Sequence, residues 1–365
     1  MNNESLQTIV KHFAVDDTAT SITPFGRGHI NTTYKVCTPK QNYLLQKVNT
    51  DIFNDIDGLM RNVKLVTEHI QQKLRAQNHP SPQQAGLTLI NTQNGNTYYQ
   101  DHNNHAWRLL HFIDDSCTHE MITDPELAEK GAQAFGQFQQ LVADIDVNQL
   151  NITIPDFLHL PTRLQQFQHM IEKDPLNRAK DIKHEIKSVQ QMQDHLSRTQ
   201  QLADNGTLPQ RVTHNDTKLN NVLFSKTGEA LCVIDLDTVM PGLVQFDFSD
   251  IIRTAANRAL EDERDLSQVG LNPTLFTAIT RGFLSATCNV LTKAEIELLA
   301  PAAHLMPFML STRFLTDYLQ GDTYFRIHRP GQNLDRARCQ LKLSQDIAQQ
   351  MDELQQSVER IVATC

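Results

Sequence analysis

The chain has 365 residues, a length that allows two or three domain-sized units with a substantial core. Its formal net charge is −9, and because nucleic-acid backbones attract basic surfaces, a nucleic-acid partner is not expected. The six cysteines are scattered and form no CxxC pair, which favours free thiols in a reducing cytosol over a disulfide framework.

No export or membrane segment is expected. Residues 1–4 (Met-Asn-Asn-Glu) lack the basic and then apolar order of a signal peptide. The most apolar stretch, 298–310, is too short to span a bilayer and contains two prolines. These features predict a cytoplasmic protein with no membrane partner, and they leave its oligomeric state open.

Residues 1–113 show the pattern of a strand-rich domain that contains one helix. Short β-branched or aromatic runs predict strands at 20–25, 31–37, 43–48, 87–91, 97–100 and 106–113. Between the third and fourth runs, residues 55–73 carry apolar side chains at a helical period. This order of strands and one helix is that of a kinase-like N-terminal lobe.

Residues 114–365 are predicted to be mostly helical. Apolar stripes indicate helices at 125–143, 160–174, 181–203, 245–259, 272–287, 293–319 and 334–362. Asp124 is the expected N-cap of the first of these helices. A hairpin at 222–225 and 230–235 forms a small β-island among them. The predicted fold is therefore α+β, with a β-rich lobe at 1–113 and a helical lobe at 114–365.

The most informative motif is His214-x-Asp216-x-Lys218-x-x-Asn221, which precedes a predicted strand. Asp235 follows Asn221 fourteen residues later, at the end of a second strand. Kinase catalytic loops have the same order of parts: an Asp base, an Asn for one metal ion, and a later Asp for magnesium. The motif therefore predicts a phosphoryl-transfer site.

The chemistry of phosphoryl transfer explains these residue types. Asp216 would orient the attacking hydroxyl and accept its proton, while Asn221 and Asp235 offer the oxygen ligands that Mg²⁺ prefers. Lys218 would contact the γ-phosphate of ATP as a point charge. The alternative is a structural turn rich in Asn, Asp and Thr that is followed by a strand.

A glycine-containing loop lies between the first two predicted strands. Gly26 and Gly28 would let backbone N–H groups approach phosphates, although Asn31 replaces the third glycine of a GxGxxG loop. An ordinary hairpin is the alternative interpretation. Phe112, in the linker between the lobes, is expected to border the adenine.

These motifs resemble the aminoglycoside phosphotransferase and choline kinase superfamily, and within it the N-acetylhexosamine 1-kinases. The resemblance rests on residues 28–34, 59–63, 212–221, 234–242, 313–315 and 321–325. It implies an enzyme of carbohydrate metabolism, a phosphotransferase with an alcohol acceptor, which uses ATP and Mg²⁺ to phosphorylate the anomeric hydroxyl of GlcNAc or GalNAc. Its partner would be that small-molecule sugar.

The resemblance also implies roles for individual residues. Asp216 becomes the base on the anomeric hydroxyl, and His29, Arg313 and Tyr324 become sugar contacts. Asp247 and Asp250 would brace the catalytic loop or the following helix rather than take part in the chemistry.

Three alternatives remain open from the residues themselves. Arg313 lies in an apolar helix and could form a salt bridge with Asp317 at i+4. The acceptor could be another small alcohol, such as choline, homoserine, methylthioribose or an aminoglycoside. A catalytically silent binding module is disfavoured, because Asp216, Asn221 and Asp235 are all present.

The chain departs from the protein kinase pattern at the lysine of the third strand. Gln46 occupies that position, Lys47 falls on the other strand face, and Asn62 stands where the helix usually carries Glu. We expect Lys47 to matter little for activity. Asp237 is a further candidate metal ligand, provided that the strand continues through it.

Overall fold

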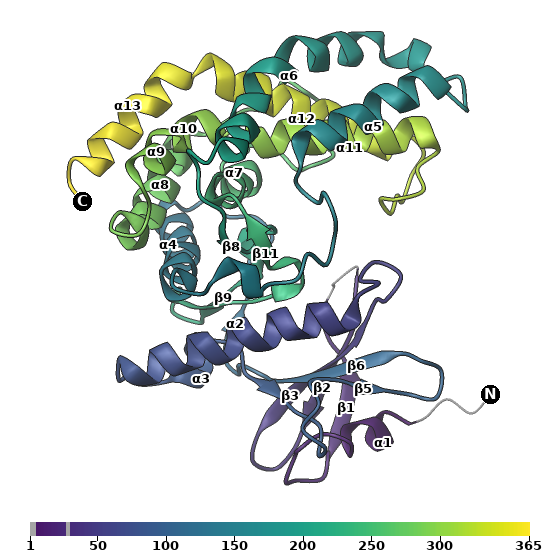
Figure 1. Cartoon of the computed structure of the whole chain (residues 1–365), viewed down its shortest axis with the longest axis vertical. Coiled ribbons are helices and arrows are strands. Elements are labelled where there is room, and N and C mark those ends of the chain that lie inside the picture. Colours follow the sequence, from purple (N-terminus) through teal and green to yellow (C-terminus); the bar gives the residue numbers. More distant parts are fainter. Residues whose placement is uncertain (1–4, 27–29) are drawn as a thin grey trace. The chain divides into compact units, whose positions relative to one another are not determined.

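The computed structural model describes residues 5–26 and 30–365 and confirms the predicted protein-kinase-like α+β fold (Figure 1). The chain divides into two compact units. The sheet unit comprises Met1–Thr118, Leu141–Pro155 and Asn221–Pro241, and the helical unit comprises His119–Gln140, Asp156–Asn220 and Gly242–Cys365. Each unit is therefore assembled from several stretches of chain, whereas the sequence suggested one boundary near residue 113.

The sheet unit is built on an antiparallel sheet with the order β1-β2-β3-β6-β4, in which β5 also pairs with β6. The strands are β1 (Ser21–Pro24), β2 (Thr32–Cys37), β3 (Asn42–Val48), β4 (Leu89–Ile90), β5 (Tyr99–Gln100) and β6 (Ala106–His111). Each lies within a run that the sequence predicted, except that β3 begins one residue earlier, at Asn42. The register places Gln46 of β3 opposite Arg108 of β6.

One face of this sheet packs against α1 (Leu6–Val10). The core there is formed by Ile9, Val10, Phe13, Val36, Leu45, Trp107 and Leu109. The predicted helix of this unit is α2 (Ile56–Ala76), which is followed by α3 (Pro82–Ala85). The Asp55 side chain caps α2 by accepting a hydrogen bond from Gly58 N at 2.8 Å.

A second, three-stranded sheet has the order β10-β9-β7. It contains β7 (Ser116–Cys117), β9 (Val222–Ser225) and β10 (Ala230–Val233). The β9–β10 hairpin turns at Gly228, which has a φ of 82° and donates its N–H to Ser225 O at 3.0 Å. Two further strands, β8 (Arg211–Thr213) and β11 (Met240–Gly242), flank the hairpin in the sequence.

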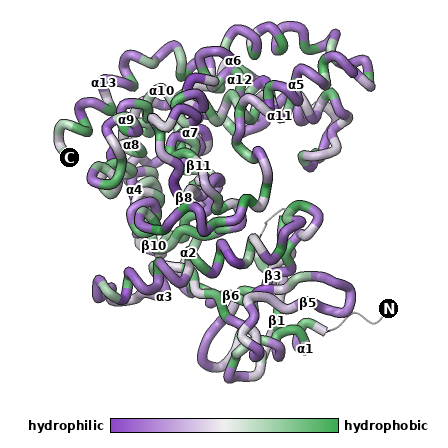
Figure 2. Tube along the Cα trace, viewed as in Figure 1, coloured by the Kyte–Doolittle hydropathy of each residue, from purple (hydrophilic) through white to green (hydrophobic). Residues whose placement is uncertain are grey.

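The helical unit surrounds a core to which α5, α6, α7, α11 and α12 contribute. Its helices are α4 (Pro125–Val142), α5 (Leu160–Lys173), α6 (Lys183–Asp204), α7 (Val244–Ala255), α8 (Pro273–Thr287), α9 (Lys293–Glu297), α10 (Leu299–Ala302), α11 (Leu305–Gln320), α12 (Gln332–Gln349) and α13 (Met351–Val362). The chain also contains four short 3₁₀ turns: η1 (Val147–Gln149), η2 (Ala179–Ile182), η3 (Leu219–Asn221) and η4 (Leu236–Thr238). Figure 2 shows α6 as a mainly hydrophilic trace interrupted by apolar residues, as expected for an outer helix.

Two long helices that the sequence predicted are interrupted. Residues 293–319 form α9, α10 and α11, and Pro307 lies in the first turn of α11. A proline there loses no intrahelical hydrogen bond, so the residue is better suited to a helix start than to a helix interior. Residues 334–362 are divided at Gln350 into α12 and α13.

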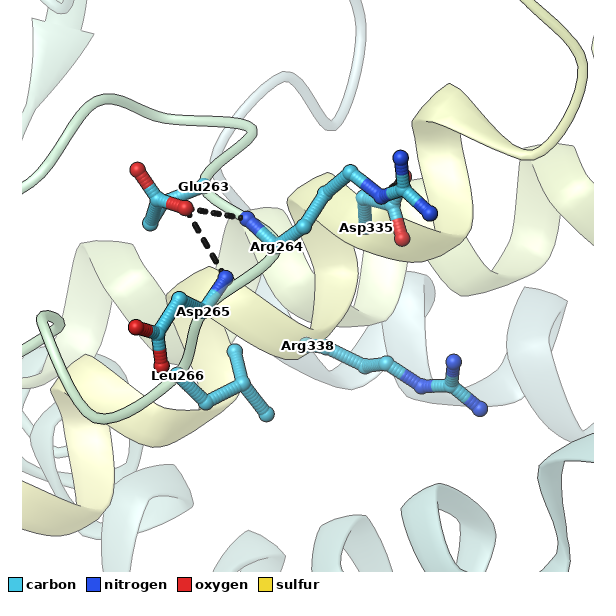
Figure 3. Close-up of a pocket in the computed structure, with 6 residues that line it drawn as sticks. All are labelled: Glu263, Arg264, Asp265, Leu266, Asp335 and Arg338. Atoms are coloured by element: carbon cyan, nitrogen blue, oxygen red, sulfur yellow. Dashed lines mark hydrogen bonds and ion pairs between the residues drawn. The ribbon is translucent and has the colours of Figure 1, made fainter.

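No helix in residues 5–26 and 30–365 combines the length and the apolar character that crossing a membrane requires. A pocket of about 630 Å³ opens in the helical unit (Figure 3). It is lined by Glu263, Arg264, Asp265, Leu266, Asp335 and Arg338, none of which the sequence had singled out. The Glu263 carboxylate closes the turn on its rim by accepting the backbone N–H groups of Arg264 and Asp265, both at 2.8 Å.

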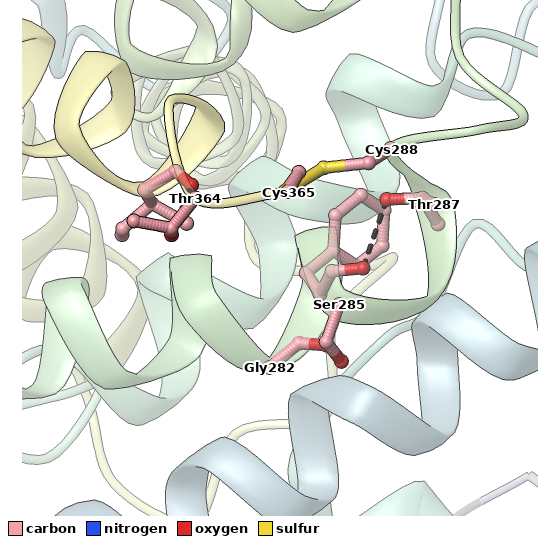
Figure 4. The surroundings of a disulfide bond; sticks show 8 residues. Gly282, Ser285, Thr287, Cys288, Thr364 and Cys365 are labelled. Carbon is pink, nitrogen blue, oxygen red and sulfur yellow. Dashed lines mark hydrogen bonds between the residues drawn. A yellow bond between two sulfur atoms is a disulfide. The ribbon is translucent and has the colours of Figure 1, made fainter.

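Cys288 and Cys365 form a disulfide (Figure 4). The expectation of six free thiols is therefore wrong for this pair, whereas Cys37, Cys117, Cys232 and Cys339 are thiols. The two bonded cysteines are separated by 77 residues. Their partnership depends on the chain end lying beside the end of α8, which no local cysteine spacing could indicate.

Candidate active site in the two units

The predicted catalytic loop follows β8 in the helical unit. Asn215 adopts a left-handed conformation with a φ of 62°, and its side-chain oxygen accepts a hydrogen bond from Thr213 Oγ1 at 3.0 Å. Gly242 lies against this turn, because a Cβ there would come within 2.2 Å of Thr213 Oγ1 and 3.0 Å of the Asn215 oxygen. The tight approach requires glycine at position 242.

Asp247 of α7 anchors the backbone of the loop. Its carboxylate accepts hydrogen bonds from His214 N at 2.9 Å, from Asn215 N at 2.8 Å and from Gln139 Nε2 at 2.8 Å. The Thr217 hydroxyl donates to Asp247 O at 2.5 Å. This arrangement agrees with the bracing role that the family resemblance implied for Asp247.

Burial raises the pKa of Asp247 to about 7, and Asp250 adds to this effect. The three N–H donors act in the opposite direction by stabilising the carboxylate. Since these donors are uncharged, no cation contacts the Asp247 carboxylate through a hydrogen bond in the described chain.

Asp216 and Lys218 form an ion pair on the loop, with 3.0 Å between Lys218 Nζ and an Asp216 oxygen. Burial disfavours the charged form of Asp216, but the charge of Lys218 and the Lys218 hydrogen bond hold its pKa below the usual value. The Asp216 carboxylate in turn raises the pKa of Lys218. At neutral pH the loop therefore presents a carboxylate beside an ammonium group.

Asp250 belongs to a second buried ion pair, in which Arg253 Nε donates to its carboxylate at 2.7 Å. Arg253 also donates from Nη1 to Glu261 at 2.7 Å. Burial raises the pKa of Asp250, and the charge of Arg253 partly offsets the rise. Asp250 thus holds Arg253 in place, and the charge of Arg253 adds to the lowering of the Asp216 pKa.

His214 anchors the loop to helix α4. Its ring is fully buried and packs edge-on against Phe135 and Phe138 of α4, with centroids 5.5 Å and 5.7 Å away. Its Nδ1 accepts a hydrogen bond from Asp216 N at 3.3 Å. The motif histidine therefore fixes the backbone that carries Asp216.

The two predicted metal ligands lie in the sheet unit. The N–H of Ile234 donates to Asn221 O at 2.9 Å, which ties Asn221 to the residue that precedes Asp235. Asp235 is exposed and adopts a left-handed conformation with a φ of 61°. An amide oxygen and a carboxylate fit Mg²⁺, which commonly takes one or two protein ligands and completes its shell with phosphate oxygens and water.

In the described residues, no three His, Cys, Asp or Glu side chains cluster as a metal site. Such a two-ligand arrangement is in keeping with that result, since Mg²⁺ held with substrate phosphates needs no full cage of protein ligands. The donor chemistry of Asn221 and Asp235 is the part of the site that fits the ion the motif implied.

Asp237 is committed to other partners. The strand β10 ends at Val233, so the condition for placing Asp237 on the same strand face as Asp235 is not met. Asp237 is buried and forms an ion pair with Arg108 Nη1, and it accepts a hydrogen bond from Asn31 Nδ2 at 2.7 Å. Asp237 thus links β6 and the glycine loop to the segment that carries Asp235.

Arg108 is a buried residue beside the candidate site residues of the sheet unit that sequence reasoning missed. It is 3% exposed within β6, and its Nε donates to Gln46 Oε1 at 2.9 Å. The available signal was a single arginine in an otherwise apolar strand, since a buried charge requires a partner. The sheet unit therefore does contain a fixed cation, supplied by β6 rather than by β3.

Gln46 and Asn62, the two neutral amides, have separate partners. Gln46 contacts Arg108 and also donates to Thr33 Oγ1 at 3.2 Å. Asn62 is buried in α2, where its Nδ2 donates to Asn151 O at 2.8 Å and to Val239 O at 3.0 Å. Asn62 thus fastens α2 to the segment that follows Asp237.

The predicted nucleotide loop is described in part. Gly26 has a φ of 77° and no atom within 4 Å of a built Cβ, whereas Gly28 and His29 lie outside the described residues. Phe112 forms an edge-to-face pair with Phe25 at 5.0 Å between centroids, and Lys35 Nζ lies 3.9 Å from the centre of its ring. Phe112 is therefore a half-exposed aromatic surface close to a cation.

Arg313 and Tyr324 come together in the helical unit. Arg313 Nη2 donates to the Tyr324 hydroxyl at 3.3 Å, and its guanidinium lies 5.2 Å from the Phe157 ring and 5.4 Å from the Phe325 ring. Tyr324 is 63% exposed. The two residues thus form an aromatic and cationic wall that is accessible to a ligand.

The suggested salt bridge between Arg313 and Asp317 is not formed. The Asp317 carboxylate instead accepts the backbone N–H groups of Thr323, Tyr324 and Phe325 at 2.8–2.9 Å. Asp317 therefore fixes the loop that presents Tyr324, and the Arg313 guanidinium remains directed at the rings.

The site residues thus divide between the units. The helical unit holds Asp216, Lys218, Arg313 and Tyr324, and the sheet unit holds Gly26, Phe112, Asn221 and Asp235. The charge of Arg253 acts in the same direction on both residues, since it lowers the pKa of Asp216 and that of Arg313.

A family model described as "Phosphotransferase enzyme family" matches residues 21–272, which is more than half of the chain. The chain belongs to the phosphotransferase enzyme family. The match includes the catalytic loop, both predicted metal ligands and the two braces, Asp237 and Asp247.

Solved structures of this kind support the fold. An aminoglycoside phosphotransferase from Alicyclobacillus acidocaldarius matches with a TM-score of 0.60 and 15% identity over 99% of this chain and 98% of the other. A microcompartment-associated aminopropanol kinase matches with a TM-score of 0.64 and 14% identity over 95% and 97%. A spectinomycin phosphotransferase in complex with ADP and spectinomycin matches with a TM-score of 0.55 and 12% identity over 95% and 98%.

Proposed function

We propose that this phosphotransferase is an ATP-dependent small-molecule kinase that phosphorylates the anomeric hydroxyl of N-acetylhexosamines, GlcNAc or GalNAc. The observation that carries the proposal is the Asp216–Lys218 pair on a loop braced by Asp247, within one unit that also presents the Arg313–Tyr324 wall. The braced carboxylate supports the kinase chemistry, and the wall supports a sugar acceptor.

Asp216 would orient the anomeric hydroxyl and accept its proton as the new O–P bond forms. Its depressed pKa makes it a weak base, which suits phosphoryl transfer, since positioning contributes more there than proton abstraction. Lys218 would stabilise the negative charge that develops on the transferred phosphoryl oxygens.

Asn221 and Asp235 would hold Mg²⁺, which when bound neutralises phosphate oxygens. Gly26 and Gly28 would border the phosphates of ATP, and Phe112 would face the adenine. The spectinomycin phosphotransferase bound to ADP supports a nucleotide in this fold. His29, Arg313 and Tyr324 would contact the sugar, with the arginine and the phenol positioned to hydrogen-bond its carbonyl and hydroxyl oxygens.

A second candidate is a kinase of a different small alcohol, favoured by the aminoglycoside and aminopropanol kinases that share the fold. The cation of Arg313 favours the hexosamine over these amine-bearing acceptors. One assay separates the two candidates: ADP release measured with GlcNAc, GalNAc, choline and kanamycin. Turnover with the acetylated sugars and phosphate on C1 of the product would support the proposal, and turnover with choline or kanamycin alone would refute it.

The base assignment has its own test. Asp216→Asn keeps the size of the side chain but removes the charge and the proton acceptor, so kcat should fall by about 10²–10⁴-fold. ATP binding, measured by calorimetry, should stay within about threefold of the wild type, because Asp216 faces the acceptor. A variant with near-normal kcat would exclude Asp216 as the base.

A further inference from the structure

Arg313 is not the only guanidinium at the wall. Arg163 of α5 donates from Nη2 to Phe157 O at 3.1 Å, and the Arg313 guanidinium lies 5.2 Å from the ring of the same Phe157. Arg163 and Arg313 thus meet at one residue, from two different helices. Both are half-buried.

The charges of these two arginines are not balanced by acidic partners. Within the helical unit neither forms a salt bridge, whereas Lys218 is paired with Asp216 and Arg253 with Asp250. Exposed Asp156 attracts Arg163 without reaching ion-pair distance. The other polar contacts of Arg163 are with uncharged groups, Phe157 O and the Gln166 side chain.

The electrostatic consequences of this arrangement are visible in both residues. Burial lowers the pKa of Arg313 to about 10, with a further contribution from Arg163 that opposes the effect of Tyr324. Burial also lowers the pKa of Arg163. Two neighbouring, partly buried cations favour a ligand with a negative or carbonyl oxygen and repel a ligand with a positive charge.

We propose that Arg163 is a specificity-determining residue of the acceptor site, which together with Arg313 favours acceptors with a carbonyl or anionic oxygen and disfavours acceptors with an ammonium group. The proposal rests on the function proposed above for this site. Arg163 would have two effects. It adds a second positive charge to the wall, and its hydrogen bond to Phe157 O fixes the residue whose ring Arg313 contacts.

GlcNAc and glucosamine test the proposal, because they differ only at one position, where GlcNAc has an N-acetyl group and glucosamine has a free amine. The ratio of their kcat/KM values should be measured at a pH that keeps the amine protonated. Wild type should favour GlcNAc, and Arg163→Gln should lower the ratio by about tenfold, since one charge is removed from a weakly screened site. Arg163→Lys should keep the ratio within about threefold of wild type, because it retains the charge.

Arg198→Gln is the matched control. It removes the same charge from an exposed position on α6 in the same unit and should leave the ratio unchanged. A measurement on wild type alone adds a test that needs no variant to fold: the ratio should fall as ionic strength rises, because salt screens the repulsion of the amine.

The outcomes separate this inference from the proposed function. If wild type phosphorylates GlcNAc and glucosamine equally well, or if Arg163→Gln leaves the ratio unchanged, the inference is overturned and the hexosamine kinase stands. If GlcNAc is inert while aminopropanol is phosphorylated, both are overturned. If GlcNAc is inert while another uncharged or anionic alcohol is the acceptor, the function is overturned and the inference stands.

Discussion

Two buried aspartates, one in each unit, hold the candidate-site residues of their own unit by different means. Asp247 in the helical unit holds the catalytic loop through uncharged N–H donors from His214, Asn215 and Gln139. Asp237 in the sheet unit is held by the charged Arg108 and by the amide of Asn31. Both carboxylates are 3% exposed or less.

The difference shows two ways in which a protein can stabilise a buried carboxylate, each with its own weakness. Neutral donors leave the charge of Asp247 uncompensated, so its protonation becomes sensitive to pH near neutrality. An ion pair compensates Asp237, but removal of either partner leaves a buried charge alone. The stabilisation by Asp247 should therefore depend on pH, and the stabilisation by Asp237 should be sensitive to the loss of Arg108.

The largest effect is expected for Arg108→Met, which leaves Asp237 buried without its cation. The free energy of unfolding, measured by urea denaturation, should fall by about 3–5 kcal/mol. The double variant Arg108→Met/Asp237→Leu should recover most of this loss. Arg281→Met, which breaks an ion pair between more exposed side chains at Glu129, should cost no more than about 1 kcal/mol. Equal losses in the two single variants would contradict the comparison.

The disulfide gives a stability change that is independent of both braces. Cys365→Ser opens a link between residues 77 apart, so unfolding in oxidising buffer should become easier by about 2–4 kcal/mol. With a reducing agent the variant and wild type should unfold alike, and kcat should be equal in both. A change in kcat would show that the chain end is coupled to the catalytic loop.

Asp247→Asn replaces one of the two acceptor oxygens with an N–H₂ group that faces a donor. We expect a stability loss of about 1–3 kcal/mol and a fall in kcat of about 10–100-fold as the loop shifts, with little change in ATP binding. Kinetics and calorimetry on the same preparation measure both. A loss of ATP affinity with normal kcat would contradict the bracing role.

The same variant tests the pH response. Because the folded pKa of Asp247 is raised to about 7 from an ordinary value near 3.8, the folded protein binds this proton more tightly than the unfolded chain does. The contribution of Asp247 to stability is therefore greatest below pH ~4 and is lost as pH rises through the folded pKa of about 7, with a slope of about 1.4 kcal/mol per pH unit at most. Asp247→Asn should remove this slope, and an unchanged slope would assign it to another group.

The smallest effect is expected for Lys47→Ala. Arg108 supplies the fixed cation of the sheet unit, so loss of Lys47 should lower kcat/KM by less than about tenfold. A loss near 10³-fold would mean that Lys47 takes the role of the protein kinase lysine.

Much of the fold could be predicted because its signals are local. The helical period of 55–73 predicted α2, and the short β-branched or aromatic runs in the first 113 residues predicted the strands of the larger sheet. The breaks at Leu298, around residue 303 and at Gln350 were not predicted, since the apolar stripe continues across them. The i+4 spacing suggested a salt bridge between Arg313 and Asp317. The Asp317 carboxylate instead accepts hydrogen bonds from the backbone N–H groups of residues 323–325.

The sequence by itself determined the chemistry: the spacing of His214, Asp216, Lys218, Asn221 and Asp235 indicated phosphoryl transfer, because those residue types at that spacing have few other uses. Only the tertiary structure decided which residues far apart in the sequence meet. Arg108 with Asp237, Arg163 beside Arg313, and Cys288 with Cys365 are each joined across more than 70 residues. Such pairings depend on how helices and strands pack, and no period or spacing along the chain encodes them.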